Sequence, residues 1–394
     1  MNAPLFDIDI PGMQAAVNKF QPGQGFVWSK LFPLKYTRKF DIKGIEGDDG
    51  IPVAADRVAF NTKAPKKTRK KIGNWSGKLS KYSVSREKDE IEINDYKDSQ
   101  TLANAATENQ QEKQELVRIV YDDVTFCRQA MDAKVEIDAM RIASSGIQSF
   151  PEKIEGEMAS QDIINFNVPA KNFVGYGVST KTVKKNGAST QVKTAAWDDV
   201  DAADGLGDII AAQNIVKKQG LPKPRFAFME LEKFQQLCAQ KATVRRLFPK
   251  VTDLERITAE EINLQSINAY MTKAENGFPQ IVILDTYATI EHKDGEKETI
   301  KPWNVNVVTL SATAQLGWTF YKNVPLVENT EALQVYGSFY KMTRYSEVNP
   351  MLEVTMAEAY VQPALINRQS LVFINTMNEN WNDGEAQPLK AKRR

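Results

Sequence analysis

The sequence predicts an α+β fold organised around one long helix, and three observations support this prediction. No glycine or proline occurs between Lys78 and Ser145, so a helix can run without interruption through residues 99–144. Residues 197–337 combine short apolar strands with amphipathic helices, which indicates a mixed α/β unit with its own core. Residues 338–378 contain strands but no helix. We therefore expect those strands to return to the long helix, so that two separated pieces of chain form one domain.

Composition limits the class of protein. The chain has 394 residues, 42% of them hydrophobic and 26% charged, which is typical of a folded protein with two or three cores. With 51 basic and 50 acidic residues the net charge is +1, which argues against a protein whose main task is to neutralise nucleic acid. Apolar runs stay far below the ~20 residues of a membrane helix, and the N-terminus shows no secretory signal. We expect folding in a cytoplasm and no membrane partner.

The first 96 residues predict an arm followed by a β-ribbon. Residues 1–50 read as an irregular arm, because glycines and prolines are scattered among the apolar residues. In residues 51–96, Tyr82, Val84, Ile91 and Ile93 alternate with charged residues, as on a two-stranded ribbon with one solvated face. Such a ribbon cannot bury enough surface to be stable alone, so we expect it to lie on a neighbour.

A basic cluster and a tryptophan stand out on this ribbon: Lys66, Lys67, Arg69, Lys70, Lys71 and Trp75. Three interpretations stay open. The cluster is a solvated loop tip, as most charge runs are, or a docking strip for an acidic surface of another subunit, or a nucleic-acid contact. The last is the weakest, because a single tryptophan is no repeated stacking platform for bases.

The long helix of residues 99–144 is predicted from apolar residues spaced three or four apart. Asp98 or Ser99 can cap its start, and Gly146 supplies a left-handed stop. A helix of this length would measure about 70 Å, and it lacks the heptad seam of a coiled coil. We interpret it as a spine that spans a flat, extended subunit. Its core residues are Leu116, Val120, Val124, Cys127, Met131 and Val135, with Ala139 and Ile142 continuing the stripe.

An acidic stretch at residues 198–208 follows strand-like residues 163–178 and a polar connection at 181–194. Its five aspartates invite comparison with a calcium loop. Counted from Asp199, however, the glycine required at position 6 comes one residue late, at Gly205, and position 12 is Ile210 rather than glutamate. We interpret the aspartates instead as residues favoured by the positive end of a following helix that ends near Gly220.

The remaining elements alternate in type up to a polar tail. In residues 338–378, Leu352, Val354 and Met356 alternate with polar residues, and 371–374 is a continuous apolar run. We expect residues 379–394 to form a flexible basic tail. The elements expected within residues 197–337 are a strand at 225–228, a helix at 230–241, a helix with a capping box of Thr258 and Glu261, a strand at 281–290, a hairpin turn at 294–295, and strands at 297–301, 305–310 and 316–321.

Candidate catalytic residues are few. His292 is the single histidine and lies beside the hairpin turn, which argues against a histidine-based triad and excludes multi-histidine metal sites. Neither a phosphate-binding loop nor a nucleophile-elbow motif occurs. Cys127 and Cys238 are expected to be reduced thiols rather than a disulfide. We therefore predict no enzyme, no catalytic or metal-binding residues and no cofactor, and a structural or binding role instead.

The order of these elements resembles that of the lambda-type major head protein family of tailed bacteriophages, which has the Hong Kong-97-type fold. Four stretches carry the resemblance: KLFPLKYTRKFDIKGIEG, IPVAADRV, PQIVILDTYATIEHKDGEKETIKPWNVNVVTL and EVNPMLEVTMAEAYVQPALINRQSLVFINT. Asn349-Pro350 stands where an acidic residue before proline is more usual, and the tail runs past the usual end. The domains that the resemblance implies are an N-terminal arm (1–50), an E-loop (51–96), a P-domain with the spine helix (97–196 and 338–378), an A-domain (197–337) and the tail (379–394).

The resemblance implies a structural major capsid protein that forms the hexamers and pentamers of an icosahedral shell. That shell would enclose double-stranded DNA without sequence-specific binding, as part of a virion capsid assembled in the cytoplasm of a host bacterium. Expected partners are other copies of the chain and separate scaffold, portal, maturation protease and decoration proteins. The basic residues and Trp75 of the E-loop would contact adjacent subunits, and lysines such as Lys63 are candidates for a crosslink whose asparagine partner the sequence does not identify. The alternative is a DNA-binding or capsid-decorating module that acts through the basic loop 66–71.

Overall fold

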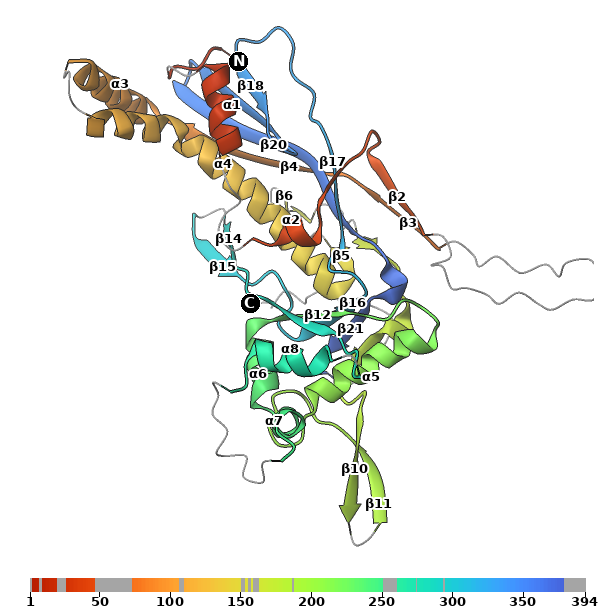
Figure 1. Cartoon of the computed structure of the whole chain (residues 1–394). Helices are drawn as coiled ribbons and strands as arrows, with labels where there is room; N and C mark the ends of the chain where they lie inside the picture. Colours follow the sequence, from red (N-terminus) through yellow and green to blue (C-terminus); the bar gives the residue numbers. More distant parts are fainter. Residues whose placement is uncertain are drawn as a thin grey trace, which may run out of the picture.

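The computed structural model describes residues 2–6, 9–19, 26–46, 73–105, 110–149, 153–154, 157–158, 163–185, 188–250, 261–273, 275–292 and 295–378. The body is elongated (Figure 1). A long helix, α4, and a six-stranded sheet form one end, and a five-stranded sheet with four helices forms the other. No helix in these ranges has both the length and the hydrophobicity needed to cross a membrane.

Helix α4 (Gln110–Ser145) is the central element of the upper part, at 36 residues or about 54 Å. It ends as predicted, because Gly146 has φ +72° and its N–H bonds to the carbonyl of Ile142 at 2.8 Å. Its start was predicted wrongly. A separate helix, α3 (Glu90–Ala105), precedes it, and residues 106–109 between the two lie outside the described ranges.

Helix α3 also replaces part of the predicted ribbon. Asp89 accepts a hydrogen bond from the Glu92 N–H at 2.9 Å, and the Glu92 carboxylate accepts one from the Asp89 N–H at 3.2 Å. This reciprocal capping box starts a helix at Glu90, so neither Asp98 nor Ser99 is the cap and Ile91 and Ile93 are helical rather than extended. Ile93 is buried with Phe6, while Ile91 is exposed, as helical geometry allows.

The six-stranded sheet, here called the upper sheet, packs on α4. Its strand order is β1-β17-β20-β19-β18, and β4 also pairs with β20 along residues 353–361. Cys127 of α4 bonds to the carbonyl of Thr355 in β20 at 3.5 Å, so the prediction that a late strand returns to the long helix is confirmed for β20. The strands are β1 (Leu34–Tyr36), β4 (Ser80–Lys88), β17 (Gly317–Lys322), β18 (Leu333–Tyr336), β19 (Lys341–Glu347) and β20 (Leu352–Leu365).

The five-stranded sheet, here called the lower sheet, has the order β13-β12-β16-β21-β9 and a core of its own. The end of α4 touches it, because the Thr309 hydroxyl donates to the carbonyl of Ala143 at 2.8 Å. The strands are β9 (Phe173–Gly175), β12 (Phe226–Glu230), β13 (Gln280–Leu284), β16 (Val307–Ser311) and β21 (Val372–Asn375). The helices are α5 (Gly205–Lys218), α6 (Leu231–Ala239), α7 (Lys241–Leu247) and α8 (Leu264–Met271).

Strand pairing cuts across the predicted domain ranges. Strand β21, expected to return to the long helix, instead pairs with β16 and β9 in the lower sheet. Strands β17 and β18, within the range expected for the inserted unit, belong to the upper sheet. Alternation and apolar runs mark a strand but do not specify its partner, which is set by distant residues. The range boundaries themselves stay predictions.

Short paired strands and turns complete the described chain. The polar connection expected at 181–194 is a hairpin, while the hairpin expected near Gly295 (φ +82°) is confirmed. The strand expected at 281–290 is two strands, broken at 285–287. The pairs are β2 (Asp41–Glu46) with β3 (Gly73–Lys78), β5 (Ile147–Ser149) with β8 (Ile163–Asn165), β6 (Lys153–Ile154) with β7 (Glu157–Met158), β10 (Thr180–Lys185) with β11 (Ala188–Lys193), and β14 (Ala288–Glu291) with β15 (Lys297–Ile300); the short helical turns are η1 (Ala170–Asn172) and η3 (Arg368–Ser370).

Two further differences concern helices. The arm is not wholly irregular: it contains α1 (Ile10–Lys19) and α2 (Trp28–Leu31), and Met13 and Val17 of α1 are buried in the core shared with α4. Helix α8 starts later than expected, with a capping box of Asn263 and Ser266; of the predicted box, Thr258 lies outside the described residues.

Candidate assembly elements

The apolar face of α4 is the first element that the sequence singled out. Val124, Cys127, Met131 and Val135 are all buried against the upper sheet and the arm. The side chains of Leu116 and Val120 lie outside the described part of the chain. Burial raises the pKa of the Cys127 thiol to about 12, so the thiol stays protonated and unreactive at neutral pH. This face forms part of the main core of the chain.

A second side of α4 carries buried carboxylates that the sequence analysis did not single out. Glu136 accepts hydrogen bonds from the backbone N–H groups of Val27 at 3.1 Å and Trp28 at 2.7 Å. Burial raises the pKa of Glu136 to about 7, although the two N–H bonds act in the opposite direction. Arg128, about two turns earlier in α4, donates a hydrogen bond to the carbonyl of Val17. Polar groups of α4 thus fasten the arm to the spine at α1 and α2.

The first residues of the chain are held in a similar way at the far end of the upper sheet. Arg344 and Glu353 form an ion pair of 2.7 Å in which both side chains have 0% exposure. The Leu5 N–H donates to Glu353 at 2.8 Å, and the Phe6 ring lies 5.0 Å from the Arg344 guanidinium. Burial raises the pKa of Glu353, while Leu5 and Arg344 oppose this shift. Residues 2–6 therefore cover a buried ion pair. No local sequence pattern predicts this contact.

Strand β4 is fastened to α4 by ion pairs rather than left as a free ribbon. Asp123 of α4 pairs with Lys88 at 2.7 Å and with Arg86 at 3.3 Å. Farther along the helix, the Tyr82 hydroxyl donates to Asp138. The part of the predicted ribbon that follows residue 80 is therefore integral to the subunit.

The projecting ribbon is formed by β2 and β3, which extend from one side of the body (Figure 1). Trp75 packs the ribbon against the body: the indole is 4% exposed, and its ring lies 4.9 Å from that of Phe166 at 67°. This burial leaves little of the indole for a neighbouring subunit, and its assignment as an inter-subunit contact stays a prediction. Glu46 pairs with Gly73, so residues 47–72 connect the two strands at the ribbon's end. The predicted basic contacts Lys66, Lys67, Arg69, Lys70 and Lys71, and Lys63, lie outside the described residues.

The acidic stretch after Trp197 is used for folding. Asp204 caps α5 by accepting from the Gly207 N–H at 3.0 Å, and it pairs with Arg246 at 2.7 Å. Asp208 is buried and accepts from the Trp197 indole at 3.0 Å as well as from Ser179 and Thr194. Burial raises the pKa of Asp208, and these donors oppose the shift. The helix-terminus interpretation thus agrees with these contacts.

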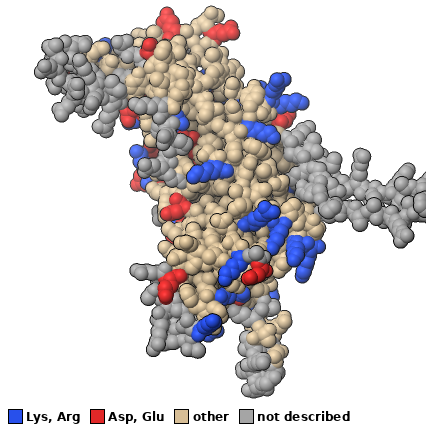
Figure 2. Space-filling model, in the orientation of Figure 1, with Lys and Arg blue, Asp and Glu red and all other residues tan. Residues whose placement is uncertain are grey.

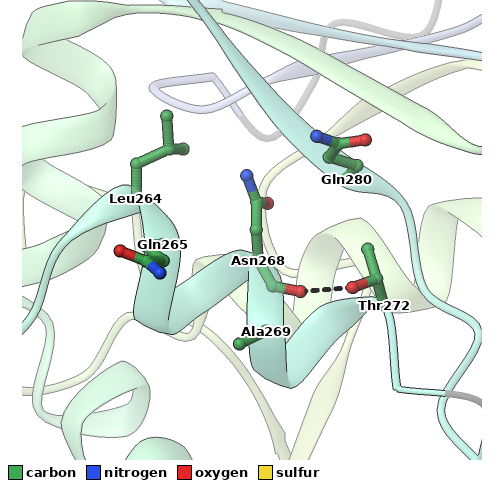
Figure 3. Close-up of a pocket in the computed structure, with 6 residues that line it drawn as sticks. All are labelled: Leu264, Gln265, Asn268, Ala269, Thr272 and Gln280. Carbon is green, nitrogen blue, oxygen red and sulfur yellow. Dashed lines mark hydrogen bonds between the residues drawn. The ribbon is translucent and has the colours of Figure 1, made fainter.

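A pocket of about 670 Å³ lies beside α8 and is lined by no ionisable side chain (Figure 3). Asn268 of α8 accepts from the Ile281 N–H at 2.7 Å and donates to the Ile281 carbonyl at 3.0 Å, which covers the edge strand β13. The pocket is lined by Leu264, Gln265, Asn268, Ala269, Thr272 and Gln280.

His292, the single histidine, contacts Glu298 at 3.0 Å at an exposed site. The described residues contain no group of three metal-ligating side chains.

Solved structures similar to this chain include two of nearly the same extent. One is described as the "putative capsid protein of prophage" of Escherichia coli CFT073, with 13% identity and a TM-score of 0.52, covering 93% of this chain and 99% of the other. The second is a phage-related protein from Bordetella bronchiseptica RB50, with 14% identity and a TM-score of 0.50, covering 95% and 98%. No protein family and no curated protein matches the sequence. The likeness lies in the path of the whole chain and not in single residues.

Proposed function

We propose that this chain, which has the Hong Kong-97-type phage capsid fold, is a structural major capsid protein. It would form the hexamers and pentamers of an icosahedral shell that encloses double-stranded DNA, within a virion assembled in the host bacterial cytoplasm. The observation that carries the proposal is the fold itself, shared over 93% of this chain with the protein described as the "putative capsid protein of prophage".

The shape of the subunit supports association as its purpose. The spine α4 is about 54 Å long, and the body around it is elongated (Figure 1). The ribbons β2–β3 and β10–β11 pair only with themselves among the described strands. A two-stranded ribbon is marginal alone. The β2–β3 ribbon is packed on the body through Trp75, whereas β10–β11 would gain stability when another subunit covers it. Repeated copies of one interface then close into rings or shells.

The parts of the subunit have proposed roles in that shell. Residues 51–72 would extend the β2–β3 ribbon across an adjacent subunit, with the basic residues 66–71 as its contacts. Residues 197–337 would form most of the domain at the capsomer centre, and residues 97–196 and 338–378 the spine domain. Separate scaffold, portal, maturation protease and decoration proteins would complete the particle.

The test is assembly itself. The full chain, expressed with its scaffold and portal, should give shells or capsomer rings in electron micrographs and sediment as large particles. A variant in which residues 51–72 are replaced by a short glycine-serine linker should fold but stay unassembled, because the proposed docking segment is gone. Strictly monomeric wild-type protein under these conditions, or intact shells from the variant, would contradict the proposal.

A further inference from the structure

Basic side chains gather on one face of the lower sheet domain. Figure 2 shows the blue side chains concentrated over the end of α5, with little red among them. Five exposed cations come from three adjoining segments, and we call them the α5 basic surface: Lys171, Lys217, Lys218, Lys223 and Arg225. The chain as a whole carries a net charge of only +1, so this surface is a local feature.

The backbone beneath these cations is held firmly. Asn172 donates to the carbonyls of Gln369 at 2.7 Å and Leu371 at 2.8 Å, and it accepts from Gln219 at 3.2 Å. This last bond ties the turn that carries Lys171 to the end of α5, where Lys217 and Lys218 lie.

The connection that follows α5 is fixed as well. Gln213 donates to the carbonyl of Pro224 at 2.8 Å, and the Arg225 N–H donates to the carbonyl of Ser311 at 2.8 Å. Lys223 extends over the turn that ends at Gly277. Ordering these side chains on a ligand would therefore require little change in the backbone.

The cations of this surface have no acidic partner in the described chain, unlike several of its other cations. Lys88, Lys301 and Arg344 each contact a carboxylate at 2.8 Å or less. None of the five cations of the α5 basic surface forms an ion pair with a described carboxylate. Lys273 and Glu275 lie in the adjoining turn, where the backbone carbonyl of Lys273 accepts from the Gly277 N–H at 2.8 Å. One further cation and one exposed carboxylate therefore border the surface.

We propose that the α5 basic surface binds the phosphate backbone of duplex DNA without regard to sequence. Cations spread over a firm surface suit a chain of phosphates, from which they release counterions. The exposed aromatic residues in the described chain, Tyr36, Phe40, Tyr287 and Tyr336, belong to none of these three segments. Stacking on unpaired bases therefore has no platform here, which favours duplex over single strands.

This inference deepens the proposed capsid function and rests on it, because it identifies a face of the subunit that would meet the enclosed DNA. A surface of five cations is small. It would give weak contacts that become important only when many subunits present them together. Such contacts position DNA against a shell without holding it tightly along its length.

The test compares two triple variants of the full-length chain with equal loss of charge. Lys217→Gln/Lys218→Gln/Lys223→Gln removes the centre of the surface, whereas Lys30→Gln/Lys97→Gln/Lys297→Gln removes three exposed lysines elsewhere. Binding of a fluorescent random-sequence duplex is measured by anisotropy over a salt series, with Tm as the check on folding. The first triple should weaken binding about tenfold or more at low salt and reduce the salt slope by about 1 per cation removed. The second should stay close to the wild type.

Equal losses in the two triples, or an unchanged salt slope in the first, would overturn the inference. Competition by poly-glutamate as effective as by duplex would also overturn it, in favour of an acidic protein partner. Assembly is scored separately by sedimentation of the same proteins. If the protein assembles into shells and the first triple variant binds DNA as the wild type does, this inference alone is refuted. If the first triple variant loses DNA binding but the chain never assembles, the capsid function alone is refuted.

Discussion

The two sides of α4 hold the subunit together by different physical means. The apolar side, with Met131 and Val135, packs against neighbours by burial alone, and its contribution depends on shape and area. The other side fixes the arm through Glu136, whose buried carboxylate accepts two backbone N–H groups. The first kind of contact is insensitive to pH, whereas the second changes with the protonation of one group. The arm is therefore the part of this subunit whose attachment can be tuned.

The strongest test of the apolar side is Met131→Asp, which places a charge where the side chain is 2% exposed. Burying an unpaired carboxylate costs several kcal/mol, so the variant should lose about 4 kcal/mol or more and fail to accumulate as soluble protein. Solubility and urea unfolding measure this. Met131→Leu keeps the volume and should cost under about 1.5 kcal/mol. A soluble, cooperatively folded Met131→Asp protein would show that this side of the helix is not the core.

The buried Arg344–Glu353 ion pair tests whether a polar contact contributes as much to the free energy of unfolding as the apolar side of α4 does. Arg344→Met leaves Glu353 buried without its cation, and removal of one partner of such a pair costs about 3–5 kcal/mol. The double variant Arg344→Met/Glu353→Gln should recover much of that loss, because no unpaired charge remains. Urea unfolding of both variants gives the coupling between the two residues. Equal stability of the single and double variants would mean that the pair acts only as packing.

The sequence predicted the apolar side of α4 but not the polar one, and the reason is physical. Repetition at three and four residues is a local signal, and so is the stop at Gly146, which the structure confirms. The role of Glu136 depends on Val27 and Trp28, 109 and 108 residues away in the chain. The Arg344–Glu353 pair likewise needs Leu5 to complete it.

The same distinction explains the errors at the level of elements. Asp89 and Glu92 form a capping box that is visible in the sequence, yet alternation around Ile91 and Ile93 favoured a strand there. Strand β21 was recognised as apolar, but its place in the lower sheet depends on β16 and β9. Of the proposed site, the basic residues of the α5 surface were visible individually. Only the fold brings Lys171 beside Lys217 and Lys218.

The pH dependence of the polar side is set by Glu136. Its pKa is raised from 4.5 in the unfolded chain to about 7 in the folded protein, so the folded state binds the proton more tightly. The resulting stability is complete below about pH 4.5 and is lost as the pH rises through about 7. Asp132, with its pKa raised to about 6, adds a change of the same sign.

Glu136→Gln keeps an oxygen acceptor for Val27 and Trp28 but cannot ionise. We expect its free energy of unfolding to exceed that of the wild type by about 1–3 kcal/mol at pH 8 and to match it near pH 4. Urea unfolding across this range measures the difference. Glu136→Ala removes the acceptor and should be less stable than Glu136→Gln at every pH. A wild-type protein that gains stability between pH 5 and 8 relative to Glu136→Gln would reverse the assigned sign.

The smallest effect is expected in the alkylation rate of Cys127. This rate shows whether the apolar side of α4 stays covered when the arm detaches. Burial raises the pKa of Cys127 to about 12, and Cys127 lies on the apolar side under β20. Loosening of the arm at pH 8 should therefore leave this thiol protected, because its cover comes from the sheet. Alkylation at pH 8 should be far slower at Cys127 in the native protein than in urea, and Glu136→Ala should change the native rate little. Rapid alkylation of Cys127 in Glu136→Ala would mean that the arm, and not β20, seals the spine, and the two sides of α4 would then be one cooperative unit.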